Sequence, residues 1–240
     1  MIEIYAVTIP PGADKADFAG LLPLLEPDKR RRIERLVRSD SVVQSLCGEL
    51  LARMAIAWRR RAPLRAIRFQ RGASGKPELI GGGLCFNVGH CLDRVVCATS
   101  DMEVGVDVET IRSFKMDIVR RFFAAAECAD ILSVPAAERP RRFFHIWTLK
   151  ESYLKAVGSG LTIPLNSFAM KVQGESITIR ASGTALSAYG FRSWFWDDRC
   201  WISLCALERP LPSAFKIIHG DSLRHAMASL DSDAPFRLSE

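Results

Sequence analysis

Apolar residues along this chain follow two spacings. Between residues 40 and 60, Val43, Leu46 and Leu50 recur every three or four positions, which places them on one face of an amphipathic helix. Elsewhere, short apolar or alternating runs lie between turns that contain glycine or proline, a pattern typical of strands. The two spacings predict helices at residues 27–37, 40–60, 116–123 and 141–157, and strands at residues 1–9, 67–70, 84–88, 94–100, 104–109, 167–172, 176–181 and 200–206.

The order of these elements divides the chain near Met102. A strand, helices and a group of strands lie before this point, and helices and strands follow again after it. We therefore expect an α+β protein with an N-terminal lobe at residues 1–102 and a C-terminal lobe at residues 103–218. Residues 219–240 are only weakly patterned and are expected to form a peripheral tail.

Composition limits the classes of partner. The 240 residues include 33 Lys and Arg against 27 Asp and Glu, a net charge of +6. Basic residues gather at 30–32, 59–61 and 139–142, at the edges of predicted helices, where solvated helix ends are the simplest interpretation. No zinc-finger, homeodomain or RNA-recognition motif accompanies them, so nucleic acid is not an expected partner.

The chain shows no pattern of a membrane or secreted protein. No apolar run reaches the roughly 18 residues of a membrane span, and the first residues lack the basic start and apolar core of a secretory signal. None of the seven cysteines belongs to a C-x-x-C pair, which argues against a structural zinc site and favours reduced thiols. We expect a cytoplasmic protein without a membrane partner.

The strand predicted at residues 104–109 carries two carboxylates. Because strand side chains alternate, Asp107 and Glu109 project from one face and the valines between them from the other. Two carboxylates this close repel each other unless a cation or a proton lies between them. A metal site is one interpretation, and a polar face whose acids pair with arginines such as Arg112 is the other.

The helix predicted at residues 141–157 carries a second group of polar residues. Trp147, Glu151 and Lys155 recur every four residues, on a different face from the apolar stripe that faces the core. A Glu–Lys pair at this spacing ordinarily does no more than support its helix. The tryptophan in the same column favours a further role for this face, although packing is the expected role of the tryptophan itself.

Two turns carry residues suited to anions. His90 follows the strand predicted at residues 84–88; a histidine there is ordinarily structural, but with Gly89 before it the ring and nearby amides could reach an anion. A second turn carries Lys76 followed by Pro77. It is not a Walker A phosphate loop, because the first glycine and the final Ser or Thr of that motif are missing.

The order and spacing of these motifs resemble one family. The motifs are Phe86-Asn87-x-x-His90, Gly105-x-Asp107-x-Glu109, Phe122-Phe123-x-x-x-Glu127 and Trp147-x-x-Lys150-Glu151-x-x-x-Lys155-x-x-Gly158-x-Gly160-Leu161. From Pro27 to about Leu207 the chain closely resembles the 4′-phosphopantetheinyl transferases of the long, surfactin-synthetase-activating (Sfp) type. This resemblance implies two pseudo-symmetric lobes, each a small antiparallel sheet packed with a long helix, that enclose one site in a monomer.

The resemblance also implies roles for single residues. Asp107, Glu109 and Glu151 resemble the Mg²⁺ ligands of the family, and hard oxygen ligands are those that Mg²⁺ favours. Glu151 or Glu127 resembles the general base, directly or through water, and Lys155 resembles the residue that holds the pyrophosphate and stabilises the leaving group. The alternative for Glu127 is a structural carboxylate at a helix N-terminus. The residues implied to bind coenzyme A are Lys29, Arg32, Ser45, Lys76, Pro77, Gly89, His90 and Lys155.

Some positions depart from the family pattern. The usual serine before the motif histidine is Gly89 in this chain, and the serine after it is Cys91. Near the start of the long helix at residues 40–60, Gln44 stands where relatives often carry arginine. These departures concern recognition of the 3′-phosphate of coenzyme A and leave the reaction class unchanged.

The sequence therefore predicts a Mg²⁺-dependent enzyme that transfers 4′-phosphopantetheine from coenzyme A to a serine of an apo acyl or peptidyl carrier protein and releases adenosine 3′,5′-bisphosphate. Carriers of this kind serve polyketide, nonribosomal peptide, antibiotic and fatty acid biosynthesis. One alternative is a Mg²⁺-dependent nucleotide phosphohydrolase or nucleotidyl transferase, which would not explain the spacing of the His90 and Lys155 motifs. Another is a non-catalytic module that binds carrier proteins, against which the intact acidic residues argue.

Overall fold

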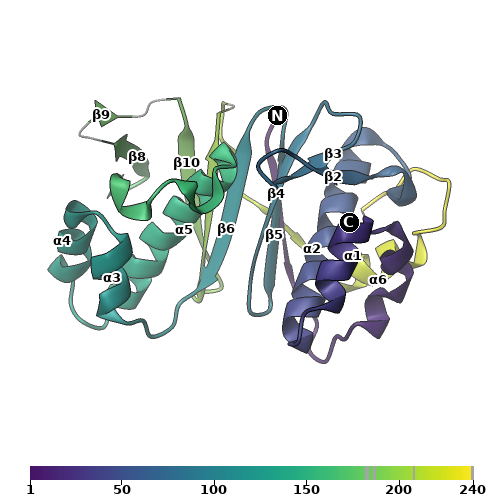
Figure 1. Cartoon of the computed structure of the whole chain (residues 1–240), viewed down its shortest axis with the longest axis horizontal. Coiled ribbons are helices and arrows are strands. Elements are labelled where there is room, and N and C mark those ends of the chain that lie inside the picture. The colour runs from purple at the N-terminus through teal and green to yellow at the C-terminus, as the bar shows by residue number, and fades with distance from the viewer. Residues whose placement is uncertain (182–183, 186–187, 208, 239–240) are drawn as a thin grey trace.

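The computed structural model describes residues 1–181, 184–185, 188–207 and 209–238, arranged as two lobes around a central pair of sheets (Figure 1). The strands are β1 (Glu3–Thr8), β2 (Phe69–Arg71), β3 (Pro77–Leu79), β4 (Cys85–Cys91), β5 (Arg94–Ser100), β6 (Val104–Thr110), β7 (Phe168–Gln173), β8 (Ser176–Ala181), β9 (Thr184–Ala185), β10 (Gly190–Trp196), β11 (Cys200–Ala206) and β12 (Lys216–Ile218). The α-helices are α1 (Pro27–Glu34), α2 (Ser39–Arg60), α3 (Met116–Phe122), α4 (Ala125–Ser133), α5 (Arg139–Val157) and α6 (Gly220–Ala228). Short 3₁₀ segments are η1 (Ala16–Leu24), η2 (Leu64–Ala66), η3 (Gly160–Thr162) and η4 (Leu165–Ser167).

The two central sheets are small, as predicted. One has the strand order β12-β1-β5-β4 and the other the order β10-β11-β6. The described ladders in these sheets are antiparallel except for β12, which pairs in parallel with β1. A long helix covers the outer side of each sheet, α2 on one lobe and α5 on the other (Figure 1). The predicted α+β class is confirmed.

Alternating side chains explain why the sheets stack. In the first sheet, Ile4 and Val96 join an apolar cluster between the sheets, whereas Tyr5 and Cys97 join the core under α2. In the second sheet, Val106 and its alternate neighbours fill the same central cluster. Strands buried on both faces carry apolar residues at successive positions. β5 is buried along its whole length, which explains the run of small and apolar residues from Val95 to Ala98.

The two long helices agree closely with their predicted limits. In α2, Leu46 and Leu50 are fully buried, as the three-and-four spacing requires. α5 ends where Gly158 adopts a left-handed conformation, with φ of 73°, and donates its N–H to the Leu154 carbonyl. α1 is shorter than predicted: it ends at Glu34, and Val37 beyond it is almost fully exposed.

The C-terminal segment differs from the expectation of a peripheral tail. β12 returns to the first sheet, and Leu223 and Ala226 of α6 are buried in the core beneath α2. Phe236 is buried there too, and its backbone N–H donates to the Ala62 carbonyl. The segment looked weakly patterned because its apolar contacts lie with residues distant in sequence, while residues 239–240 lie outside the described part of the chain.

Two further observations concern composition. Each of the seven cysteines is a free thiol. Among the described residues, none of the helices combines the length and the hydrophobicity needed to cross a bilayer.

Candidate functional site

β4 and β6 come from different sheets and lie side by side at the centre of the molecule (Figure 1). The side-chain oxygen of Asn87 on β4 accepts a hydrogen bond of 2.9 Å from the backbone N–H of Val106 on β6. Gly89 allows this approach, because a Cβ at that position would lie 3.0 Å from the Val106 carbonyl oxygen. The motif that contains His90 is thereby placed next to the strand that carries Asp107.

α5 packs against the other face of β6 without an intervening side chain. A Cβ on Gly105 would lie 2.1 Å from the Ser152 carbonyl oxygen and 2.4 Å from the Ala156 nitrogen. Such contacts are far inside van der Waals distance, so only glycine permits this helix-to-strand spacing. The close packing brings Lys155 of α5 against Asp107 of β6.

Asp107 and Lys155 form the centre of the site. The Lys155 ammonium lies 2.7 Å from Asp107 Oδ1 and donates a second hydrogen bond, of 3.2 Å, to the Val106 carbonyl. The carboxylate is only 6% exposed, and its other oxygen, Oδ2, is buried with no hydrogen-bond partner among the described residues. A buried carboxylate oxygen without a donor is unfavourable, and a cation would compensate it.

Two of the acidic residues, Asp107 and Glu151, have a raised pKa. Burial, reinforced by Glu109 and Glu151, raises the pKa of Asp107 to about 7, against the opposing effect of Lys155. Burial also raises the pKa of Glu151, which Lys155 again opposes. Among the described residues no set of three His, Cys, Asp or Glu side chains is already arranged to hold a metal ion. A metal ion bound to these carboxylates would therefore need further ligands from another molecule.

Glu109 is bound by two donors. Arg112 Nη1 lies 2.7 Å and Cys91 Sγ lies 3.0 Å from the same carboxylate oxygen, Oε2. Burial raises the pKa of the Cys91 thiol to about 11, so the thiol keeps its proton at neutral pH and donates. The pairing of Glu109 with Arg112, which the sequence offered as the alternative to a metal site, is thus observed.

Two cavities open beside these residues and share Asn87 and Pro77. The larger, of about 300 Å³, is lined by Lys76, Glu151, Lys155, Gly158 and Gly160 among others. The smaller, of about 160 Å³, is lined by Lys29, Arg32, Ser45 and His90 among others. The structure therefore brings together most of the residues predicted to bind coenzyme A. Asp107, Glu109 and Gly89 do not line either cavity but lie on the adjoining strands.

The predicted phosphate-binding cations have distinct environments. Lys29 pairs with the buried Glu49, which also binds the Arg53 guanidinium at 2.8 Å. Lys76 donates to the Val104 carbonyl at 2.9 Å and to the Ala156 carbonyl at 3.2 Å, which ties the β2–β3 turn to the C-terminal lobe. Burial lowers the pKa of Lys76.

The charges around His90 favour an anion. Loss of solvent lowers the pKa of this ring, and the nearby Lys155 and Lys29 cations lower it further, against the opposing effect of Glu109. Gln44, noted in the sequence as a departure from the family pattern, donates to the Leu92 carbonyl at 2.7 Å and also lines the smaller cavity. An anion in this cavity would relieve the repulsion between the cations.

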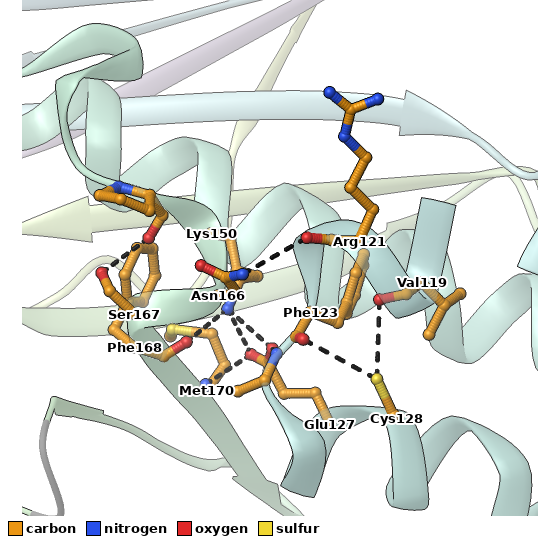
Figure 2. Close-up of polar contacts among 12 residues, drawn as sticks. Val119, Arg121, Phe123, Glu127, Cys128, Lys150, Asn166, Ser167, Phe168 and Met170 are labelled. Atoms are coloured by element: carbon orange, nitrogen blue, oxygen red, sulfur yellow. Dashed lines mark hydrogen bonds and ion pairs between the residues drawn. The ribbon is translucent and has the colours of Figure 1, made fainter. Parts of the chain in front are cut away.

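Glu127 lies away from both cavities, in a buried network with Lys150 (Figure 2). The Lys150 ammonium is 2.8 Å and 2.7 Å from the two Glu127 oxygens and donates to the Phe168 carbonyl at 2.7 Å. The backbone N–H groups of Ala124 and Met170 also donate to Glu127, at 2.8 Å and 2.7 Å. With about 1% exposure and four hydrogen bonds from three donor groups, this carboxylate fits the structural alternative, and its placement argues against the general base.

Two ring side chains of α5, Trp147 and His145, have packing roles outside the two cavities. Trp147 packs against Phe122, Phe123 and Phe143. His145 stacks on Trp201, with ring centroids 3.8 Å apart.

The functional interpretation of the sequence missed the Lys150–Glu127 pair and the Cys91 thiol. The sequence pattern does not show that Lys150 is buried. Lys150 comes directly after Leu149 of the apolar stripe, and its acidic partner, Glu127, lies on another helix. In the sequence, Cys91 stands out only as a departure from the family serine. Its position directly after His90, at the end of β4, was the available signal.

Comparison with known proteins agrees with this geometry. Residues 103–203 match the family model of the 4′-phosphopantetheinyl transferase superfamily, and residues 12–102 match the model of the 4′-phosphopantetheinyl transferase N-terminal domain. The chain is 25% identical to the 4′-phosphopantetheinyl transferase Sfp of Bacillus subtilis over 92% of this chain and 100% of that protein. It is 35% identical to the transferase gsp of Aneurinibacillus migulanus over 70% of each chain. It is 34% identical to the transferase psf-1 of Bacillus pumilus over 71% of this chain and 75% of that one. The chain therefore belongs to the 4′-phosphopantetheinyl transferase superfamily, as an enzyme of the Sfp type.

Proposed function

We propose that this enzyme binds coenzyme A across the seam between β4 and β6 and, with Mg²⁺, transfers 4′-phosphopantetheine to a serine of an apo carrier protein. The leaving product is adenosine 3′,5′-bisphosphate. The observation that carries the proposal is the buried Asp107–Lys155 pair, with an orphaned carboxylate oxygen, beside two cavities lined by basic residues.

The two cavities support the proposal for coenzyme A. This molecule carries a pyrophosphate and a 3′-phosphate, and the basic lining residues come from both lobes. Lys29, Arg32 and His90 line the smaller cavity, and Lys76 and Lys155 line the larger one. We assign these residues, with Ser45, Pro77 and the Gly89 backbone, to the coenzyme.

The donor set supports Mg²⁺. Asp107, Glu109 and Glu151 supply carboxylate oxygens, and Mg²⁺ is usually held by one or two carboxylates together with phosphate oxygens and water. The absence of a complete protein cage among the described residues suits an ion whose other ligands come from the coenzyme. When bound, Mg²⁺ would act as a Lewis acid and neutralise part of the negative charge of the pyrophosphate.

In this proposal, residues of the chain accept the proton of the serine and stabilise the charge of the leaving group. Glu151, which lines the larger cavity, accepts the proton of the carrier serine, directly or through water. The serine oxygen forms a bond to the β-phosphorus while the bond from that phosphorus to the leaving phosphate oxygen breaks. Lys155, which lines the cavity, stabilises the negative charge that develops on the leaving phosphate.

The lobes support one site per chain. The two family models meet between residues 102 and 103, the boundary proposed for the lobes. Because both lobes line the cavities, a monomer would be complete. Residues 216–238 pack with the N-terminal lobe, so we assign them to it. The cytoplasmic location and the exclusion of nucleic acid stay predictions.

Intact-mass spectrometry tests the proposed function. Purified enzyme with coenzyme A and Mg²⁺ should add about 340 Da, the mass of a phosphopantetheine group, to an apo carrier protein. Glu151→Gln should abolish the addition while the variant remains folded, and Glu138→Gln, at the exposed N-cap position just before the same helix, is the matched control. Unchanged mass across a panel of acyl and peptidyl carriers would contradict the proposal.

A further inference from the structure

Glu109 is held on one side only. Cys91, the last residue of β4, and Arg112, just beyond β6, both donate to Oε2 of its carboxylate. Among the described residues no donor is bonded to the other oxygen, Oε1. Arg112 reaches Glu109 from three residues along the same segment, whereas Cys91 reaches it because β4 and β6, from different sheets, are packed together.

Arg112 is fixed more firmly than an ordinary surface arginine. The same Nη1 that binds Glu109 donates to the Thr110 carbonyl at 2.9 Å, and the guanidinium carbon lies 4.6 Å from the centre of the Phe144 ring. A simple exposed ion pair would have little effect. Here a stacked guanidinium and a thiol together restrict the rotation of one carboxylate.

We propose that Cys91 and Arg112 are positioning residues that hold Oε2 of Glu109, so that Oε1 remains available to the divalent metal. This inference rests on the proposed function, in which Glu109 is a metal ligand. Hydrogen bonds to the non-coordinating atoms of metal ligands orient them, and removing such a bond typically weakens metal affinity about 10- to 100-fold.

Cys91 provides the cleaner test because its removal changes no charge. Removing Arg112 also removes a cation close to the metal position, which by electrostatics alone would strengthen metal binding. Loss of orientation would weaken it. The direction of the change in Arg112→Ala therefore separates a positioning role from a competing positive charge.

Metal affinity is measured with Mn²⁺ as the probe, from the electron paramagnetic resonance signal of free Mn²⁺, with saturating coenzyme A and the full-length protein. We expect Cys91→Ala to weaken Mn²⁺ binding about tenfold or more. Cys91→Ser should bind Mn²⁺ within about twofold of the wild-type affinity, because the hydroxyl is also a donor. Arg112→Ala should weaken Mn²⁺ binding. Cys128→Ala is the matched control, since that thiol is also partly buried but donates to the Val119 and Phe123 carbonyls and packs in the core of the C-terminal lobe. Thermal unfolding without metal checks that each variant is folded.

The outcomes distinguish this inference from the proposed function. Wild-type affinity in Cys91→Ala, or tighter binding in Arg112→Ala, overturns the positioning role even if the wild type modifies carriers normally. Equal weakening in Cys91→Ser and Cys91→Ala would overturn it too, because a hydroxyl should replace the thiol as donor. A wild type that neither binds Mn²⁺ nor modifies any carrier overturns the proposed function, and the inference with it.

Discussion

Gly105→Ala is predicted to separate α5 from β6. The added Cβ would lie 2.1 Å from the Ser152 carbonyl oxygen and 2.4 Å from the Ala156 nitrogen, and both of these are backbone atoms of the helix. Real Cβ contacts are essentially never shorter than 3.0 Å, so the helix must retreat by about 1 Å. No side-chain rotation can relieve the clash.

The size of the effect follows from the Lys155–Asp107 distance of 2.7 Å. A retreat of about 1 Å stretches this contact beyond hydrogen-bond distance, and misplacement of a catalytic group by that amount can lower the rate about 100-fold. Overpacking at such a site typically costs about 1 to 3 kcal/mol of unfolding free energy. We expect both effects in one variant.

Two assays check the prediction. The rate of phosphopantetheine transfer is followed by carrier mass, and the free energy of unfolding is obtained from urea titration. Gly20→Ala is the matched control, because its Cβ would meet only the flexible ends of Leu230 and Met227, at 3.4 Å and 3.7 Å. A Gly105→Ala enzyme with the stability and transfer rate of the wild type would refute the argument that glycine sets the position of α5.

Two predictions concern buried groups outside the site. Glu127→Gln leaves the Lys150 ammonium buried without a counter-charge, so urea titration should show that the free energy of unfolding falls by about 3 to 5 kcal/mol. The control is Asp130→Asn, in the more exposed pair with Arg142, which should lower it by at most about 1 kcal/mol. Equal losses in the two variants would contradict the structural role of Glu127. Burial, assisted by the Arg142 and Arg141 cations, lowers the pKa of His145 to about 3, below its ordinary value of 6.5, so the unfolded chain binds a proton that the folded one rejects. Stability should therefore fall as the pH drops below about 6.5, by up to about 1.4 kcal/mol per pH unit, and His145→Phe, which keeps a ring against Trp201, should reduce that slope; an unchanged slope would disprove the assignment.

The sequence was sufficient for elements whose pattern is local. The spacing of Leu46 and Leu50 predicted α2 almost to its ends, and the alternation around Asp107 predicted which face of β6 carries the acids. In each case the signal lies within one helix or strand, so no knowledge of its neighbours is needed.

Contacts between distant elements could not be predicted in this way. The close packing at Gly105 depends on where α5 lies, and the burial of Lys150 depends on Glu127 from a different helix. α6 has too few apolar residues to show a strong pattern, although Leu223 is buried once the chain returns to the N-terminal lobe. Resemblance to a family indicated residues of the site without indicating these supports.

The most direct test of the central claim measures both products of one reaction. After incubation of apo carrier, coenzyme A, Mg²⁺ and enzyme, we predict one phosphopantetheine on the carrier serine, located by tandem mass spectrometry, for each adenosine 3′,5′-bisphosphate released. Release of the nucleotide without modification of the serine would contradict the account, because it would make the chain a hydrolase and not a transferase.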